Sequence, residues 1–479
     1  MIGWLILALL LAVAAVVAVR TARFKPAPEE AVVSVRPEVD ADGAAMRLSR
    51  LIQCRTESHA DEAEDDAAEY AKLEALLPEL YPTVHKVCTR EKIGRRGLLY
   101  RWRGQTDEAP IILTAHYDVV PAEDAEWKRP PFAGEIADGM IHGRGTLDTK
   151  CTLCAILEAA EALLNEGFTP ARDVYLCFGG NEEIMGYGAS EIVDALQTRG
   201  VRPAFVLDEG GAIVEKVFPG VRQPAALIGV AEKGSVNYQL ECLSEGGHSS
   251  APPTRSPVDR VARACVRIHD KPFPFRVTKP ASMLFNGLAC HSTPLYRMIF
   301  ANLWLFGPVL NLLCRKSGGE MNALLRTTIA FTRMQGSASA NVLPPRATMT
   351  LNARVLQGES IDGVRAALVR RAGDPKISVT VLSGSEPSGC SDVEGFACIR
   401  RAIREVYPGV LVSPYLMIAS SDARYYEKLC GYVYRFSGMA LSAEERHMIH
   451  GLDERLPVAK LADTVRFYRR VLENAQRKA

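Results

Sequence analysis

Residues 173–183 read DVYLCFGGNEE, an apolar run that ends in two glycines, an asparagine and two glutamates. The run 173–178 has the length and the apolar character of a buried strand. Strand-like runs at 111–115 and 205–207 also end at polar residues, and a helical stretch, 152–166, lies among them. This alternation predicts an α/β domain with a mostly parallel central sheet covered by helices.

The loops that follow these strands carry residue types that bind metal ions. In α/β sheets, catalytic side chains tend to lie beyond the carboxyl ends of the strands. Histidines and carboxylates occur in the segments 113–121, 141–150, 179–183, 205–211 and 448–455. Each cluster, taken alone, is also compatible with a solvated polar turn. Two histidines with three carboxylates favour a pair of zinc ions over a closed cysteine site.

The spacing within three clusters indicates different roles. Side chains two positions apart on an extended segment point the same way, so Asp118 is placed to hydrogen-bond the His116 imidazole and fix its tautomer. Glycines around Asp148 allow tight turns that put this carboxylate at the start of a helix, where it suits a bridging ligand. Glu182 and Glu183 repel each other, so one is expected to bind a cation while its neighbour moves protons.

The ordered motifs resemble the aminoacylase and carboxypeptidase S family of dinuclear zinc hydrolases, over nearly all of residues 46–472. The carboxypeptidase S-like and N-acyl amino acid hydrolase branch is the most similar, through the segment 300–308. The resemblance makes Asp118 a residue behind the ligands and Glu182 the catalytic base. It implies a cis peptide bond between Asp148 and Thr149. It implies that two zinc ions are held by His116, Asp148, Glu183, Asp208 and His450, with Asp148 bridging.

The segment 232–383 differs from the rest of the chain in its predicted secondary structure, which consists of strands around two helical stretches, 258–269 and 360–371. We expect it to form an inserted α+β lid, ferredoxin-like by the resemblance, and 44–231 with 384–479 to form the catalytic domain. The motif at 246–250 is similar to the family's lid motif, which implies that His248 stabilises an oxyanion. By the same resemblance, Asn341, Arg354 and Arg424 bind substrate, although the stretch around Arg424 reads ASSDAR where the family has GGTDAR.

The function implied by this resemblance is hydrolysis of an amide bond by a zinc-activated water, with Glu182 as general base. The substrate is a small peptide or an N-acylated amino acid, and the sequence leaves these two classes open. It also leaves open other divalent cations. A non-catalytic membrane receptor of the same fold is the alternative, and retention of Glu182 with all the ligand types argues against it. Because the lid of many relatives completes the neighbouring subunit's site, we expect a homodimer formed through the lid.

The amino terminus favours a membrane anchor. Residues 1–19 contain no charged side chain and span about 28 Å as a helix, nearly a bilayer core. The positive charges at 20, 23 and 25 follow the apolar run instead of preceding it, which favours an uncleaved anchor over a signal peptide. The positive-inside rule and the scattered cysteines then place the catalytic domain on the cytoplasmic side, after a linker at 20–43.

Two further features limit the alternatives. With a net charge of +1 over 479 residues, the chain has no overall field that would draw it to nucleic acid or to acidic lipid. A second apolar stretch, 298–314, contains Gly307, Pro308 and two asparagines and is shorter than a usual span. We expect it to be a buried or lid-surface helix.

Overall fold

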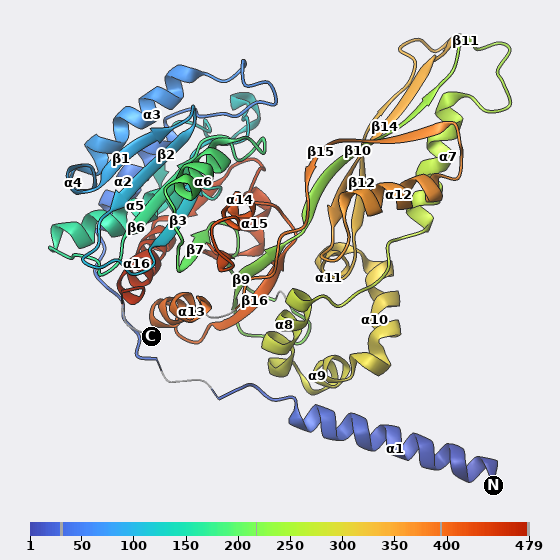
Figure 1. Ribbon diagram of the computed structural model, residues 1–479, viewed down its shortest axis with the longest axis horizontal. Helices are drawn as coiled ribbons and strands as arrows, with labels where there is room; N and C mark the ends of the chain where they lie inside the picture. Colours follow the sequence, from blue (N-terminus) through green and yellow to red (C-terminus); the bar gives the residue numbers. More distant parts are fainter. Residues whose placement is uncertain (29–31, 217, 393–394, 477–479) are drawn as a thin grey trace.

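The computed structural model describes residues 1–28, 32–216, 218–392 and 395–476. Its larger sheet comprises β1 (Thr89–Ile93), β2 (Gly97–Trp102), β3 (Ile111–His116), β6 (Val174–Gly179), β7 (Phe205–Asp208), β8 (Ile213–Val214), β9 (Ala225–Glu232), β16 (Leu411–Met417), β17 (Val433–Arg435) and β18 (Ala440–Leu441). The strand order is β1-β2-β6-β3-β7-β17-β9-β8-β18, and β16 pairs with β9 outside this path (Figure 1). The central strands β6, β3, β7 and β17 run parallel, which confirms the predicted sheet.

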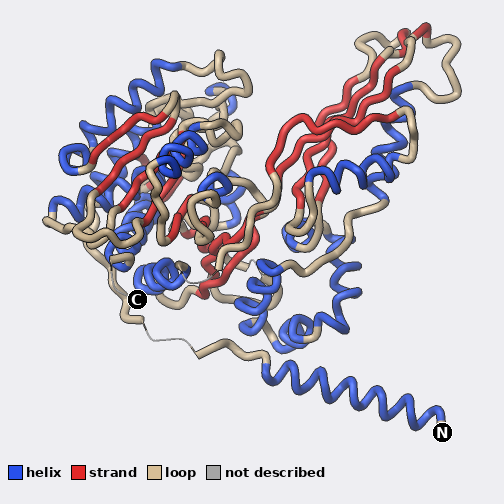
Figure 2. Tube along the Cα trace, viewed as in Figure 1, coloured by secondary structure: helices blue, strands red, loops and turns tan. Residues whose placement is uncertain are grey.

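Helices cover both faces of this sheet (Figure 2). They are α2 (Ala41–Ile52), α3 (Ala67–Leu80), α4 (Pro82–Val87), α5 (Lys150–Asn165), α6 (Gly188–Thr198), α13 (Phe396–Val406), α14 (Ala423–Tyr426), α15 (Ala443–Met448) and α16 (Val458–Asn474). In β6, Leu176 and Phe178 belong to the core that includes α2, α5 and α16, whereas Tyr175 and Cys177 pack with α6 and α14. Because both faces are buried, β6 reads as a continuous apolar run without alternation.

A smaller, antiparallel sheet forms a second body with its own core. Its order is β12 (Thr328–Gln335), β14 (Arg346–Val355), β10 (Gly234–Leu243) and β15 (Ile377–Ser385). The amphipathic helices α7 (Pro257–Asp270) and α12 (Ile361–Ala372) pack against it through residues such as Val261 and Leu368. The chain enters this sheet from β9 and leaves it after β15. A short pair, β11 (Gly247–His248) and β13 (Val342–Leu343), lies at its far tip (Figure 1).

Short elements complete the fold. The strands β4 (Ile136–Ala137), β5 (Met140–His142) and β19 (Arg455–Pro457) form a small antiparallel sheet, and η1 (Asp124–Glu126) is a 3-10 turn. Below the smaller sheet, with α8 beside β16, lie α8 (Lys279–Leu288), η2 (Ala289–His291), α9 (Pro294–Ala301), α10 (Leu303–Ser317) and α11 (Gly319–Leu324) (Figure 1). The apolar stretch 298–314 is therefore two helices, α9 and α10, which meet at an angle of 109° around Asn302.

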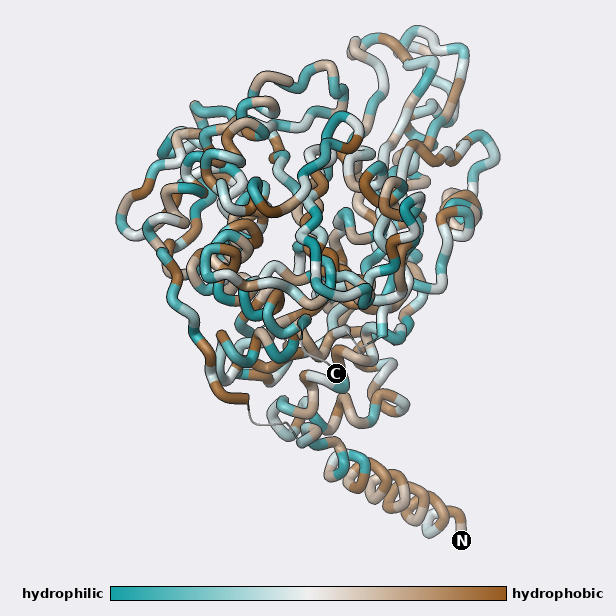
Figure 3. Tube along the Cα trace, turned by 60° about the vertical axis from the view of Figure 1, so that its left-hand side comes forward, coloured by the Kyte–Doolittle hydropathy of each residue, from teal (hydrophilic) through white to brown (hydrophobic). Residues whose placement is uncertain are grey.

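The amino-terminal helix α1 (Ile2–Arg23) projects from the rest of the molecule and none of its residues is buried (Figure 3). It is long and apolar enough to cross a membrane, a property that it shares with signal sequences. The next helix, α2, begins at Ala41, where the Asp40 carboxylate caps it by accepting a hydrogen bond from Gly43 N.

Candidate active site

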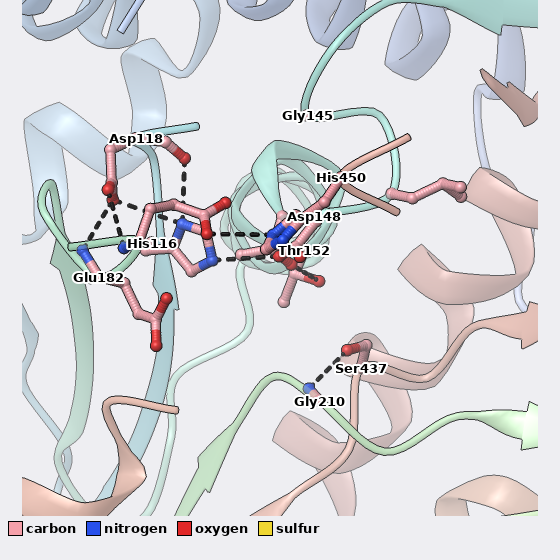
Figure 4. Close-up of polar contacts among 12 residues, drawn as sticks. His116, Asp118, Gly145, Asp148, Thr152, Glu182, Gly210, Ser437 and His450 are labelled. Atoms are coloured by element: carbon pink, nitrogen blue, oxygen red, sulfur yellow. Dashed lines mark hydrogen bonds and ion pairs between the residues drawn. The ribbon is translucent and has the colours of Figure 1, made fainter. Parts of the chain in front are cut away.

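Several of the predicted ligands meet at one edge of the larger sheet. His116 ends β3 and Asp208 ends β7, while Glu183 lies in the loop after β6. In the parallel pairing, His116 lies opposite Gly179, so the glutamates that follow β6 emerge beside it. Asp148 precedes α5 and reaches the same place from a loop (Figure 4). The shared carboxyl edge of parallel strands explains why residues so distant in sequence converge.

The Asp148 carboxylate lies between two imidazoles (Figure 4). Its Oδ1 is 3.2 Å from His116 Nε2, and its Oδ2 is 3.1 Å from His450 Nε2. His450 Nε2 is also 3.1 Å from Glu183 Oε2. Ligand atoms of His116, Asp148 and Glu183 lie within 4.8 Å of one another. This geometry suits a bridging carboxylate between two cations. The peptide bond from Asp148 to Thr149 is cis, which confirms that prediction.

Asp118 organises this cluster from behind. Its Oδ1 accepts a hydrogen bond from Glu182 N and its Oδ2 accepts one from Glu183 N, each at 3.1 Å. The Ser58 hydroxyl donates to the same carboxylate at 2.6 Å. His116 Nδ1 donates to the Asp118 carbonyl oxygen at 3.0 Å and is 3.4 Å from Oδ1. The proton on Nδ1 leaves the Nε2 lone pair facing Asp148, which is the tautomer that a metal ligand needs.

The donor set fits divalent cations. Among the described residues, the buried atoms Glu183 Oε1 and Asp208 Oδ2 have no hydrogen-bond partner, an expensive arrangement for carboxylates. Burial raises the pKa of Glu183 and of Asp208. Hydrogen bonds to Asp148 and Glu183 raise the pKa of His450 to about 10. The two carboxyl groups have lost hydration and the histidine is held by carboxylates, and metal cations bound here would stabilise the ionised carboxylates.

Glu182 lies beside this cluster with its side chain only 12% exposed. Burial raises its pKa well above the usual value, and the negative charges of Asp422, Glu183 and Glu209 add to this effect. Its carboxylate points away from the Asp118 hydrogen bonds that hold its backbone (Figure 4). A carboxylate of high proton affinity next to a metal centre has the property required of a general base.

Both of the predicted substrate-binding arginines, Arg354 and Arg424, lie near Glu182. Arg424 Nη1 is 4.0 Å from Glu182 Oε1 and donates a hydrogen bond to Ser421 O at 2.6 Å. Arg354, on β14 of the smaller sheet, donates to Ser420 Oγ at 3.2 Å. The guanidinium of Arg354 therefore comes from the smaller sheet, whereas that of Arg424 comes from the larger body. Both contribute positive charge beside a centre that is otherwise rich in carboxylates.

The structure does not bring His248 and Asn341 to this centre. His248 is exposed on β11, and its Nδ1 is 2.8 Å from Ser250 Oγ. Ser249 N donates to Asn341 O at 3.0 Å, so the two predicted residues lie together at the tip of the smaller sheet (Figure 1). The candidate set is thus divided between two places within one chain.

Glu454 is a site residue that sequence reasoning passed over. Its Oε1 accepts hydrogen bonds from Gly145 N at 3.1 Å, Leu147 N at 2.6 Å and Asp148 N at 3.2 Å. Arg144 Nη1 donates to its other oxygen at 2.8 Å. Glu454 therefore ties the loop of Asp148 to the turn that carries His450. Its signal is its position in the same turn, four residues after His450. Ser58 had no comparable signal.

The chain is similar in sequence to known hydrolases. The model of a family described as peptidase family M20/M25/M40 matches residues 112–474. A probable carboxypeptidase S-like 2 of Dictyostelium discoideum is 34% identical, covering 90% of this chain and 85% of its own. The N-fatty-acyl-amino acid synthase/hydrolase PM20D1 of Xenopus tropicalis is 34% identical, covering 93% of this chain and 88% of its own.

A solved structure supports the same fold. The M20 family metallo-carboxypeptidase Sso-CP2 from Sulfolobus solfataricus superposes with a TM-score of 0.66 at 18% identity. The match covers 90% of this chain and 98% of that one. At this sequence identity, the similarity shows that the two chains share a fold.

Proposed function

The chain belongs to peptidase family M20/M25/M40, and on that premise we propose that it is a two-zinc amidohydrolase with Glu182 as general base. Membership makes the chain a hydrolase acting on peptides or acyl-amino acids. The observation that carries the finer proposal is the placement of Asp148 between His116 and His450, with Glu183 on the same cluster. In this proposal Asp208 completes the ligand set.

The chain's own residues would divide the proton transfers among them. Zinc ions held by these ligands would supply Lewis acidity and would lower the pKa of a bound water molecule towards neutrality. Glu182 takes the proton from the attacking water, and its raised pKa suits it to keep that proton. It then delivers the proton to the nitrogen of the leaving amine. Asp118 holds the backbone of both glutamates, and in this proposal Glu183 would bind metal while Glu182 would face the substrate.

The arginines beside Glu182 give the proposal a substrate orientation. A planar guanidinium binds a carboxylate through two parallel hydrogen bonds. Arg354 and Arg424 supply such groups close to the base, so we assign them to the free carboxylate of the substrate. This carboxylate is common to peptides with a free carboxyl end and to N-acylated amino acids. We assign His248 and Asn341 to the developing oxyanion and the substrate backbone, delivered by the lid of a second copy in a homodimer.

Both substrate classes find support among the relatives. One relative is named as carboxypeptidase S-like and another as an N-fatty-acyl-amino acid synthase/hydrolase. The full chain, loaded with zinc, should be assayed against a series of dipeptides and a series of fatty-acyl amino acids. We expect amide hydrolysis in at least one series and none after chelation. Binding without turnover in both series would favour a receptor of the same fold.

The remaining assignments concern domains and location. We propose that 44–231 with 384–479 form the catalytic domain and that 232–383 form the lid, with 20–43 as the linker. We also propose that residues 1–19, within α1, anchor the chain in a membrane and that the catalytic domain faces the cytoplasm. The exposed apolar surface of α1 and its terminal Arg20 and Arg23 support this placement. Protease protection of the carboxyl terminus in intact membrane vesicles tests the orientation.

A further inference from the structure

The elbow between α9 and α10 is joined to the amino-terminal helix. Arg20 Nε donates a hydrogen bond to Ala301 O at 3.1 Å. The buried Asn302 amide donates to Thr21 Oγ1 at 3.2 Å and to Val17 O at 3.4 Å. These contacts fix the carboxyl end of α1 against the bend between α9 and α10. The elbow, residues 294–317, therefore lies beside the point where the apolar part of α1 ends (Figure 1).

The outward side of the elbow is apolar. On α10, Gly307 and Cys314 are buried and Leu303 and Leu310 pack against the core. The opposite stripe of α10 recurs at helical spacing and faces solvent, and Leu295 of α9 is exposed as well. Exposed apolar side chains on this surface are Leu295 at 61%, Trp304 at 53%, Leu305 at 39%, Val309 at 55%, Leu312 at 53% and Leu313 at 57%. An apolar patch of this kind marks an interaction surface.

The charge around the elbow identifies the chemistry of its partner. The sequence from 280 to 319 contains no Asp or Glu, whereas Arg297 lies in α9 and Arg315 and Lys316 lie in the last turn of α10. Arg20 and Arg23 lie in the last turn of α1. An apolar helix face edged by cations, with a tryptophan at its margin, has the composition of a helix that lies in the headgroup region of a bilayer.

We infer that the α9–α10 elbow lies in the headgroup region of the same membrane leaflet in which α1 ends. The lipid bilayer, with anionic headgroups, is its partner. The inference depends on the proposed anchoring of α1 and goes beyond it, since an anchor on a linker requires no second contact. Its consequence is that the body of the enzyme is held against the membrane at a fixed height and does not swing on the linker.

Tryptophan fluorescence tests this inference with the full chain. The protein is reconstituted into phosphatidylcholine and phosphatidylserine vesicles, with and without bromine on the acyl chains. Trp4→Phe isolates Trp304 as the exposed reporter, because Trp102 and Trp127 are 1% and 9% exposed. Trp304→Phe isolates Trp4 in α1, and the double variant gives the background. We expect brominated lipid to quench Trp304, most strongly when the bromines lie near the headgroups.

A second comparison tests which side chains make the contact. Val309→Asp with Leu313→Asp, introduced into the Trp4→Phe chain, should remove most of the Trp304 quenching. Val381→Asp, at an exposed apolar position on β15 in the smaller sheet, should leave the quenching unchanged.

Three results would overturn the inference. Quenching of Trp4 without quenching of Trp304 would show that α1 inserts while the elbow stays in water. Absence of quenching at both sites would remove the anchoring as well, and neither result bears on amide hydrolysis. Shielding of Trp304 from a water-soluble quencher without quenching by brominated lipid would assign the elbow to a protein partner or a second copy.

Discussion

Asp118 shows how one buried carboxylate sets several parts of the centre. It accepts hydrogen bonds from the backbone of both glutamates and from Ser58, and its carbonyl oxygen fixes the tautomer of His116. None of these bonds reaches a substrate directly. The residue therefore acts through the positions and the basicity of its neighbours.

Replacing Asp118 should accordingly weaken metal binding before it affects folding. Asp118→Asn removes the charge behind His116 and one acceptor for the glutamate backbone. A loss of about 10- to 100-fold in zinc affinity is expected for such an outer residue, measured by competition with a chromophoric chelator. Asp194→Asn, an exposed residue paired with Lys428, is the matched control and should keep its affinity. Unchanged affinity in Asp118→Asn would contradict this role.

Substitutions at the two adjacent glutamates should distinguish the general base from the metal ligand. Glu182→Gln keeps the shape of the side chain but cannot accept the proton, so turnover should fall by about 10²- to 10⁴-fold with two metals retained. Glu183→Gln should instead lose metal. Steady-state rates together with metal analysis of the same samples measure both effects. Near-normal turnover in Glu182→Gln would show that another group is the base.

Whether a site residue can be predicted from the sequence depends on what its side chain binds. Local motifs with side chains of metal-binding type contain His116, Asp148, Glu183 and His450. The types and the order of these motifs are sufficient to predict the four residues as ligands. Ser58 and Glu454 act on groups brought to them by the fold: a distant carboxylate and three backbone N–H groups. The position of Glu454 in the turn of His450 marks it as a candidate, but no local spacing encodes these pairings.

At the scale of elements, Glu454 joins two segments that carry ligands. It binds the loop before α5 through three backbone N–H groups and pairs with Arg144, whose side chain is also buried. Glu454→Gln would leave the Arg144 charge buried without its partner, a change that costs about 3 to 5 kcal/mol in other proteins. We expect a lower unfolding temperature by calorimetry. Adding Arg144→Met should restore part of the loss, and full additivity of the two changes would contradict the pairing.

Lys233 at the junction of β9 and β10 gives the stability a pH dependence. Its buried ammonium group donates to Ala323 O at 2.9 Å and to Arg326 O at 2.8 Å. Burial lowers its pKa from 10.5 to about 7. Between these values the unfolded chain binds more protons, so this group makes the free energy of unfolding rise with pH, by about 1.4 kcal/mol per unit.

The measurement is the denaturant midpoint from pH 7 to pH 10. The slope attributable to Lys233 should be absent from Lys233→Met, because methionine does not titrate. Lys376→Met, which replaces a lysine near the start of β15, serves as the control and should keep the slope. Parallel curves for the wild type and Lys233→Met would show that the lysine is charged throughout.

Elements of regular pattern were predicted well, and those defined by distant contacts were not. The strand expected at 173–178 is observed at Val174–Gly179, and the helices around 258–269 and 360–371 end within a residue of their expected bounds. The bend at Asn302 could not be predicted from local spacing, since only one acceptor of its amide, Met298 O, is local and the other two lie in α1, more than 280 residues away.

At the scale of the whole molecule, the candidate metal centre lies in the body of the larger sheet, whereas two predicted site residues lie at the tip of the smaller sheet. Arg354 reaches the centre from the smaller sheet, whereas His248 and Asn341 remain on β11 and beside β13. A symmetric pair of chains resolves this division if each tip serves the partner's centre. The sequence identifies His248 and Asn341 as candidate site residues, but it does not show whether they serve their own chain or a partner chain.

Mixing two inactive variants tests this arrangement. His248→Ala and Glu182→Gln chains are combined under conditions that allow subunit exchange, which is verified with differently tagged chains. A mixed dimer contains one centre with an intact Glu182 and an intact His248 from the other chain. We expect hydrolysis to recover in the mixture. Verified exchange with no recovery would show that each chain supplies its own histidine or that His248 has another role.

The central claim, that Asp148 bridges two zinc ions beside Glu182, is tested most directly by anomalous X-ray diffraction at the zinc edge. Crystals of the zinc-loaded chain should show two peaks about 3.5 to 4 Å apart. One peak should lie against His116 and the other against His450, with Asp148 in contact with both. A single peak, or peaks away from these three residues, would contradict the account.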